Sequence, residues 1–512
     1  KMSEKSIVQD PLVKYATQIG WAYLNRDEAV ALRGGEAGLF FYDILKEKLI
    51  KLDKKIASAS PRNDNDGIVD NEKAKEIIKK LENVKNSIEG NQEILQYLKG
   101  EKSVYSDKEK RELNIRVIDF DDIENNEFQI TDEWQYTNSK FTNRGDVIFL
   151  INGIPIIIAE AKGANKREGI EEGIVQIRRY HFETPEMMTF PQIFDVTHLL
   201  DFYYGVTWNL DRKGLFNWKD VEKGNFEKKV KTFFDREKIL QFIKDYIIFF
   251  KKDDVLSKII LRQHQTRAVE KIIDRALDKK KKTGLIWHAQ GSGKTFTMIV
   301  AAEKILQQPE FGKPTVIMLV DRNELESQLF RNLDAYGFKL EGGMEIAESK
   351  KDLQDLLSSD YRGLVVSMIH KFEGMPKDIN TRDNVFVLVD EAHRTTTGDL
   401  GNCLMAALPN ATYFGFTGTP VDKILYGKGT FKIFGREDEN GYLDKYSIAE
   451  SIEDETTMPL HYTLAPSEIR VPKEMLEKEF FSLMEKEGVS DIEELNKLLK
   501  KAVSLKNFLK SK

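Results

Sequence analysis

The stretch LIWHAQGSGKT, residues 285–295, joins a short apolar run to a glycine-rich turn, and a helical pattern follows at residues 296–306. Strand, glycine turn and helix in this order bring backbone amides and a helix N-terminus together, which indicates a phosphate-binding loop. The general pattern has glycine five positions before Gly293, where this chain has His288, so a glycine turn with a chance lysine is the alternative. The candidate nucleotide-binding residues are Gly291, Ser292, Gly293, Lys294, which would neutralise phosphate, and Thr295, which would also ligate magnesium.

The same alternation of short apolar runs and helix-length segments continues along the chain. β-Branched runs occur at residues 316–320, 364–366, 385–389 and 413–416. Runs of this kind are typical of a parallel sheet that is buried on both faces. We therefore expect a doubly wound α/β domain over residues 251–460.

Length and composition limit the remaining possibilities. With 512 residues, more than one core is expected, and a net charge of −6 means that any nucleic-acid surface must be a local basic patch. The single cysteine, Cys403, excludes a disulfide framework and a thiolate zinc site, which favours a reducing compartment. No apolar run approaches the roughly 20 residues that span a bilayer. A cytoplasmic protein with no membrane partner is expected.

An acidic motif follows the apolar run at residues 385–389. Its residues are Asp390, Glu391, Ala392 and His393. The carboxyl end of a strand in such a sheet opens onto the ligand crevice, so Asp390 is expected to hold magnesium and Glu391 to align or deprotonate the attacking water. A solvated acidic turn is the alternative, which the phosphate-binding loop makes less attractive.

These motifs resemble those of helicase superfamily 2. Asp-Glu-Ala-His is the second motor motif of that superfamily, and residues 417–420, Thr-Gly-Thr-Pro, look like the third. The resemblance implies a RecA-like fold that binds ATP and Mg²⁺, with His393, Thr417 and Thr419 coupling hydrolysis to DNA contact. It also implies that Gln265 reads adenine, although a polar residue at an exposed helix start is the alternative.

The superfamily closes its ATP site with arginines from a second RecA-like domain, and none follows Pro420 here. Such an arginine can contribute several powers of ten in rate. The chain alone is therefore expected to bind ATP but to hydrolyse it slowly. Residues 461–512 are interpreted as the helical start of a truncated following motor domain.

A second set of ionisable residues lies in an apolar hairpin at residues 145–162, where Asn152-Gly153 is a strong turn signal. Alternation along a strand places Glu160 and Lys162 on one face. A two-residue loop would turn Asp146 away from Glu160, whereas an odd loop with a left-handed Gly153 would put both on one face. We predict the odd loop.

Two carboxylates on one face can hold magnesium for phosphodiester hydrolysis, with a lysine nearby to steady the developing charge. The set Asp146, Glu160 and Lys162 resembles the PD-(D/E)xK nuclease superfamily, although Gly145 replaces the usual proline. Asp146 and Glu160 would then be metal ligands in a mixed α/β nuclease-like domain over residues 1–250. Solvated strand ends are the alternative.

Downstream, Gln176 and Tyr180 are four residues apart on a predicted amphipathic helix and share a stripe. They could contact DNA or steady the metal face as further catalytic residues, and Arg178 and Arg179 could contact phosphate. An ordinary amphipathic helix is the alternative. Two acidic residues near the start, Glu28 and Glu36, could complete the metal site or face solvent.

A nuclease core before a superfamily 2 motor, with Gln176 and Tyr180 after the carboxylates, resembles the R subunit of type I restriction enzymes. Further similar segments lie at residues 118–120, 125–126, 151–155, 320–322 and 370–372. The resemblance implies ATP-dependent translocation of duplex DNA and magnesium-dependent cleavage away from the recognition site. It also implies partner subunits for methylation (M) and specificity (S). The chain would be an N-terminal portion.

Two other classes of protein stay open. In an ATP-dependent remodeller or switch, the nuclease-like domain would only bind DNA, and replacing Asp146 with alanine would leave the activity unchanged. In a free-standing nuclease, the motor domain would be a nucleotide sensor, and the chain would cut DNA without ATP or partners. Oxygen ligands suit Mn²⁺ as well as Mg²⁺.

Overall fold

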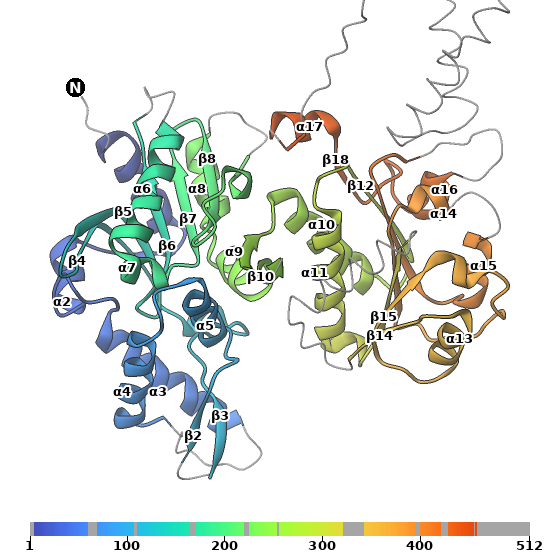
Figure 1. Ribbon diagram of the computed structural model, residues 1–512, viewed down its shortest axis with the longest axis horizontal. Helices are drawn as coiled ribbons and strands as arrows, with labels where there is room; N and C mark the ends of the chain where they lie inside the picture. Colours follow the sequence, from blue (N-terminus) through green and yellow to red (C-terminus); the bar gives the residue numbers. More distant parts are fainter. Residues whose placement is uncertain are drawn as a thin grey trace, which may run out of the picture. The chain divides into compact units, whose positions relative to one another are not determined.

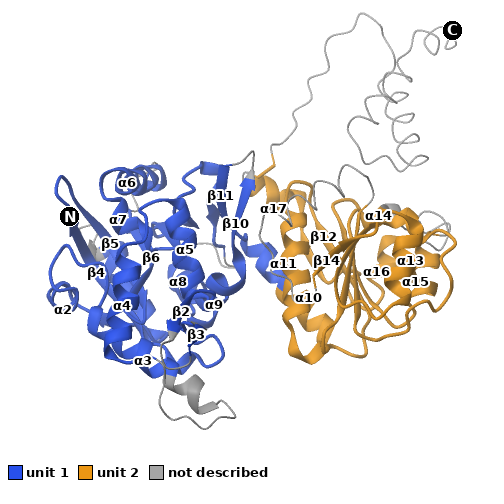
Figure 2. Ribbon diagram, turned by 60° about the horizontal axis from the view of Figure 1, so that its bottom comes forward, with its two compact units in different colours: residues 1–269, 327–339 blue, residues 270–326, 340–512 orange. Residues whose placement is uncertain are grey.

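The computed structural model describes residues 5–59, 69–106, 110–163, 169–219, 225–252, 255–320, 343–395, 400–420, 429–454 and 456–457. The chain divides into two compact units, with residues 1–269 in unit 1 and the described residues from 270 onward in unit 2 (Figure 2). The predicted helical segment 461–512 and the motif-like residues 321 and 322 lie outside the described residues. Among the residues that are described, no helix is long and apolar enough to cross a membrane.

Unit 1 is built on a seven-stranded mixed sheet in the order β1-β4-β5-β6-β7-β8-β9 (Figure 1). The pairs β1–β4 and β6–β7 are parallel and the other neighbours are antiparallel. The strands are β1 (Ala22–Leu24), β4 (Phe128–Thr137), β5 (Thr142–Ile151), β6 (Ile154–Ala161), β7 (Ile193–Thr197), β8 (Phe202–Val206) and β9 (Phe216–Asn217). Two separate hairpins complete the unit: β2 (Ser103–Ser106) with β3 (Arg111–Asn114), and β10 (Ile247–Lys252) with β11 (Val255–Ile260).

Helix α6 covers one face of this sheet. Its apolar residues Ile170, Ile174 and Ile177 pack in one buried cluster with Ile148 of β5 and Ile158 of β6. Residues 71–98 form two helices, and the second begins at its own N-cap, Ser87. The helices of unit 1 are η1 (Lys5–Gln9), α1 (Asp10–Gln18), α2 (Arg26–Leu32), α3 (Tyr42–Ala59), α4 (Asn71–Glu82), α5 (Ile88–Leu98), η2 (Ile123–Asn125), α6 (Gly169–Glu183), α7 (Pro185–Thr189), η3 (Arg212–Gly214), α8 (Phe226–Phe233), α9 (Arg236–Gln241) and η4 (Phe242–Tyr246).

In the β5–β6 hairpin the predicted odd loop is wrong, but Asp146 and Glu160 do lie on one face as predicted. Ile151 pairs directly with Ile154, and Asn152 and Gly153 both have positive φ (53° and 82°), so the turn has two residues and the odd-loop prediction is wrong. The register then shifts after Pro155, so that Val147 pairs with Ala159. The Asp146 and Glu160 side chains lie on one side, where both are within 4 Å of Lys162 Nζ. Proline has no N–H for the ladder, which explains why the irregularity lies beside it.

A buried lysine fastens the β10–β11 hairpin to the rest of unit 1. Lys258 is fully buried, and burial holds its pKa well below the ordinary value. Its Nζ donates to Asn91 Oδ1 at 2.7 Å, to the Gln192 carbonyl at 2.8 Å and to Thr207 Oγ1 at 3.2 Å. These three acceptors come from separate parts of the chain, so Lys258 holds them together.

Replacing Lys258 with alanine is expected to lower the free energy of unfolding of unit 1 by about 3 kcal/mol, because it leaves buried acceptors unsatisfied beside a cavity. Denaturant unfolding followed by tryptophan fluorescence suits this measurement, since Trp287 is the only tryptophan outside unit 1. The matched control is Lys251→Ala, which removes an exposed lysine from the same hairpin. Equal losses in both variants would contradict the anchoring role.

Unit 2 contains a seven-stranded sheet in the order β14-β15-β13-β16-β17-β12-β18, in which all neighbours are parallel. Each apolar run expected as a strand is one, so the doubly wound α/β prediction is confirmed. The two short edge strands, β14 and β18, were not predicted, because neither forms a continuous apolar run. The strands are β12 (Thr283–His288), β13 (Thr315–Val320), β14 (Met344–Ile346), β15 (Gly363–Met368), β16 (Val385–Val389), β17 (Thr412–Thr417) and β18 (Asp444–Tyr446).

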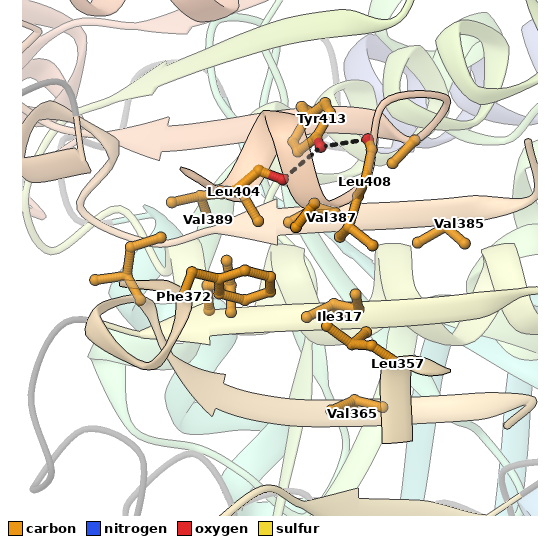
Figure 3. Packing of buried hydrophobic residues seen from close by; sticks show 14 of the residues in the cluster. Ile317, Leu357, Val365, Phe372, Val385, Val387, Val389, Leu404, Leu408 and Tyr413 are labelled. Atoms are coloured by element: carbon orange, nitrogen blue, oxygen red, sulfur yellow. Dashed lines mark hydrogen bonds between the residues drawn. The ribbon is translucent and has the colours of Figure 1, made fainter. Parts of the chain in front are cut away.

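Helices pack on both sides of this sheet, with α11 on one side and α13, α15 and α16 on the other (Figure 2). In the core, Val385, Val387 and Val389 of β16 line one face, and Tyr413 OH donates to the Leu408 carbonyl at 2.7 Å (Figure 3). The helices are α10 (Gln263–Leu277), α11 (Lys294–Gln307), η5 (Pro309–Phe311), α13 (Lys350–Ser358), η6 (Ile369–Phe372), α14 (Ala392–Thr395), α15 (Leu400–Ala407), α16 (Thr430–Phe434) and α17 (Ile448–Glu453). The unit division falls within α10.

Candidate functional site

Unit 1 brings the predicted carboxylates and lysine together at the end of the β5–β6 hairpin. Lys162 Nζ donates to Glu160 Oε2 at 3.2 Å and lies 3.8 Å from Asp146 Oδ2. Asp146 Oδ2 also accepts a hydrogen bond from the Ala161 amide at 3.0 Å. The Glu160 side chain is fully buried, whereas 14% of the Asp146 side chain is exposed. The three residues therefore form one cluster that opens to solvent on the Asp146 side.

Burial dominates the electrostatics of this cluster. Loss of solvent, together with the nearby Asp146 charge, raises the pKa of Glu160 to about 8. Burial also raises the pKa of Asp146, against the opposing effect of Lys162. One lysine thus compensates two buried carboxylates incompletely. A divalent cation would supply the missing positive charge.

Helix α6 adds Gln176 and Tyr180 to the cluster. Gln176 Oε1 accepts from Lys162 Nζ at 2.8 Å, and Gln176 Nε2 lies 2.5 Å from Tyr180 OH. Tyr180 OH in turn lies 3.1 Å from Glu160 Oε1 and contacts the Arg144 carbonyl. The two α6 side chains therefore fix the orientation of Lys162 and Glu160.

Other candidate residues of unit 1 have different partners. Arg178 donates to the Leu210 carbonyl at 2.6 Å, and Arg179 pairs with Glu183. Glu28 caps helix α2 through a capping box with Asn25, and Glu36 pairs with Arg26. Neither acidic residue thus joins the Asp146 cluster. Within the described ranges, no three His, Cys, Asp or Glu side chains gather as metal ligands.

The donor set of the cluster still fits a small oxygen-seeking cation. Asp146 and Glu160 are oxygen donors on one face, and Mg²⁺ in enzymes is commonly bound through one or two carboxylates with water completing its shell. The incomplete compensation of their charge favours such an ion. The residues therefore fit one metal site, in which Asp146 and Glu160 would be the protein ligands.

In unit 2 the glycine-rich turn follows β12 as predicted. Gly291 and Gly293 have φ values of 78° and 83°, in the left-handed region that favours glycine, and α11 begins at Lys294. A Cβ at Gly291 would meet no atom within 4 Å, so this side of the turn is open. Lys294 Nζ lies 3.4 Å from the His288 carbonyl. Thr295 is the next residue of α11 and is half-buried.

The acidic motif follows β16, and β17 lies between β16 and β12 in the sheet. The carboxyl ends of these parallel strands share one edge, so the three motifs meet there. Glu391 has a φ of 44°, and its amide donates to Asp390 Oδ1 at 2.9 Å. His393 Nδ1 lies 2.9 Å from Thr417 Oγ1 and 3.4 Å from Glu391 Oε2.

The segment after β17 packs directly on the glycine-rich turn. A Cβ at Gly418 would lie 3.1 Å from the Gln290 amide nitrogen and 3.2 Å from the His288 carbonyl oxygen, so glycine permits this close approach. The amide of Thr419 donates to Thr417 Oγ1 at 3.1 Å. Gln265 is buried in the first turn of α10, where its Oε1 accepts from the Arg262 amide at 2.8 Å.

Two contacts in these clusters were not anticipated from the sequence. The Ala161 amide binds Asp146, and Asp444 of β18 binds His288 at 2.8 Å. The first uses a backbone group, and the second joins residues 156 positions apart. No local pattern carries either signal.

Comparison with known proteins agrees with the two-unit organisation. The model of the type I restriction enzyme R protein N terminus matches residues 1–210, and the SWI2/SNF2 ATPase model matches residues 264–493.

Curated relatives match over most of this chain. The HindI type I restriction enzyme endonuclease subunit of Haemophilus influenzae is 27% identical over 97% of this chain and 50% of its own length. Two proteins of Methanocaldococcus jannaschii named as type I restriction enzyme endonuclease subunits also match. MjaIXP is 28% identical over 99% of this chain and 51% of its own length, and MjaVIIIP is 33% identical over 82% and 44%. The chain thus spans about half the length of these curated relatives.

Among solved structures, the type ISP restriction-modification enzyme LlaBIII bound to DNA is 20% identical over 40% of this chain and 17% of that chain, with a TM-score of 0.28. Because this TM-score is low, the family of the chain is assigned from the family models and the curated relatives alone. The chain belongs to the family of type I restriction enzyme R proteins, with that family's N-terminal region followed by an ATPase domain of the SWI2/SNF2 type.

Proposed function

We propose that this chain supplies the nuclease and the first motor domain of a type I restriction enzyme. In this proposal unit 1 cleaves duplex DNA away from the recognition site, and unit 2 uses ATP to translocate the DNA. The observation that carries it is the presence of two separate clusters, Asp146–Glu160–Lys162 in one unit and the converging motifs of β12, β16 and β17 in the other.

In the nuclease cluster, Asp146 and Glu160 would hold Mg²⁺, which when bound polarises a phosphodiester and favours ionisation of water. Lys162 lies between the two carboxylates and carries the positive charge that steadies the phosphate during attack. Gln176 accepts a hydrogen bond from Lys162, and Tyr180 donates one to Glu160, so each limits the motion of its partner. Gln176 and Tyr180 are therefore best described as positioning residues.

In the motor, the amides at residues 291–295 and Lys294 would bind the phosphates of ATP. Thr295 and Asp390 would hold the magnesium ion that accompanies the nucleotide, and Glu391 would orient the attacking water. His393 Nδ1 lies 2.9 Å from Thr417 Oγ1, and this contact supports a role for the pair in coupling ATP hydrolysis to DNA contact. Gln265 would contact adenine.

The partners proposed for the complete protein are duplex DNA and the methyltransferase and specificity subunits of the same complex. The assignment of residues 1–250 to the nuclease and 251–460 to the motor is part of this proposal. The test is to measure DNA cleavage and ATP hydrolysis in one reaction, with variants of Asp146 and Lys294 that each disable one cluster.

The raised pKa of Glu160 leads to a pH dependence of cation binding. Below about pH 8 the carboxyl is largely protonated, so binding a cation must expel a proton, and the affinity for Mn²⁺ should rise up to about tenfold per pH unit until it levels above pH 8. Calorimetric titration at pH 6.5, 7.5 and 8.5 measures this slope.

The same shift has a stability counterpart when no cation is bound. A carboxyl with a folded-state pKa of about 8 and an ordinary value of 4.5 contributes stability below pH 4.5, and this contribution is lost as the pH rises through 8. Glu160→Gln should lack both effects, and a wild-type affinity that does not change with pH would contradict this electrostatic account.

A further inference from the structure

One residue of the glycine-rich turn departs from the general pattern and has partners of its own. His288 ends β12 and is fully buried, and its Nε2 lies 2.8 Å from Asp444 Oδ2 on β18. The other oxygen of this carboxylate accepts from Nζ of Lys271 on α10 at 2.9 Å. One buried carboxylate therefore joins the strand before the turn, the edge strand β18 and helix α10.

The environment of Asp444 makes this link costly to break. The Asp444 side chain is only 1% exposed, and a buried carboxylate is tolerated when charged or hydrogen-bonding groups compensate it. His288 and Lys271 provide such groups from two different elements. Removal of either donor would leave charge less well compensated, so the three side chains are expected to keep one arrangement.

The backbone beside His288 contacts strand β18, Lys294 and the segment after β17. The Ala289 amide donates to the Tyr446 carbonyl at 2.9 Å, which continues the pairing of β12 with β18. The His288 carbonyl lies 3.4 Å from Lys294 Nζ. Gly418 packs against the same carbonyl and against the Gln290 amide. A displacement of residues 288–290 would therefore disturb both the contact of Lys294 with the His288 carbonyl and the packing against Gly418.

We propose that His288 is a positioning residue of the ATP site, which through Asp444 holds the backbone of residues 288–290 in place beneath Lys294 and Gly418. The inference rests on the proposed ATP-binding function of unit 2. His288 is the last residue of a strand and does not need the left-handed conformation used by Gly291 and Gly293, so glycine has no conformational advantage here. Restoring the glycine of the general pattern should accordingly harm the site.

The test is steady-state ATP hydrolysis by the complete subunit in its assembled complex, with thermal unfolding of each variant as a check on folding. His288→Gly is expected to raise KM for ATP about tenfold with little change in kcat, as expected when binding in the ground and transition states weakens equally. His288→Gln, whose amide can still donate to Asp444, should restore most of the loss. Asp444→Asn, which keeps the shape and removes the charge, should raise KM in the same direction and serves if His288→Gly does not fold.

A matched control separates positioning from stability. Arg275 of α10 pairs with Asp438 at 2.5 Å and contacts the Thr283 carbonyl at the opposite end of β12. Asp438→Asn should lower the melting temperature but leave KM for ATP unchanged. The inference is overturned if His288→Gly leaves KM within about twofold, or if Asp438→Asn raises KM as much. If Lys294→Ala also retains the wild-type KM, the proposed ATP site is wrong and the inference fails with it.

Discussion

Replacing Asp146 with alanine is expected to lower the rate of duplex DNA cleavage by about a thousandfold or more, because loss of a metal ligand removes several kcal/mol of transition-state stabilisation. ATP hydrolysis should continue, since the motifs of β12, β16 and β17 all lie in unit 2 and Asp146 lies in unit 1. The measurement is the conversion of circular duplex DNA to linear product, with the partner subunits, Mg²⁺ and ATP present.

The matched control for this variant is Asp43→Ala. Asp43 lies in the first turn of α3 in the same unit, and its side chain is 84% exposed. Its removal should leave cleavage at the wild-type rate. Unchanged cleavage by Asp146→Ala would instead support the remodeller or switch, in which unit 1 only binds DNA.

Replacing Lys294 with alanine is expected to lower ATP hydrolysis by at least about a hundredfold, since the lysine supplies the side-chain charge of the turn to the phosphates. Cleavage should fall with it, because in the proposed enzyme the DNA is moved by ATP hydrolysis before it is cut. The two clusters are therefore expected to behave asymmetrically, with cleavage depending on the motor and hydrolysis independent of the nuclease.

Lys280→Ala is the matched control for the motor, since this lysine lies in unit 2 and is exposed. It should hydrolyse ATP at the wild-type rate. Continued cleavage by Lys294→Ala, with hydrolysis abolished, would favour the free-standing nuclease in which unit 2 only senses nucleotide.

Much of unit 2 could be predicted from the sequence because its signals are local. A strand buried on both faces reads as a continuous apolar run, and Val385, Val387 and Val389 illustrate this. The motifs that follow parallel strands lie at one edge of the sheet, so the contact of Thr417 with His393 can be expected once the sheet is recognised. The three-residue β18 gives no such signal, because its pairing with β12 depends on tertiary context.

In unit 1 the common face of Asp146 and Glu160 was predicted correctly, but the odd loop from which it was predicted does not occur. Asn152-Gly153 forms the favoured two-residue turn, and the face of Asp146 is set by a register shift beside Pro155. A bulge adds one residue to one strand and leaves no periodic trace in the sequence. The α6 stripe was easier to predict, because Gln176 and Tyr180 are one helical turn apart and their spacing fixes their common direction.

The central claim is that one chain carries a nuclease in unit 1 and an ATP-driven motor in unit 2. It is tested most directly by following DNA cleavage and ATP hydrolysis together in the assembled enzyme, wild type against Asp146→Ala. The expected result is hydrolysis at the wild-type rate with no linear DNA formed. Cleavage at the wild-type rate would contradict the nuclease assignment, and simultaneous loss of both activities would contradict the separation of the two sites.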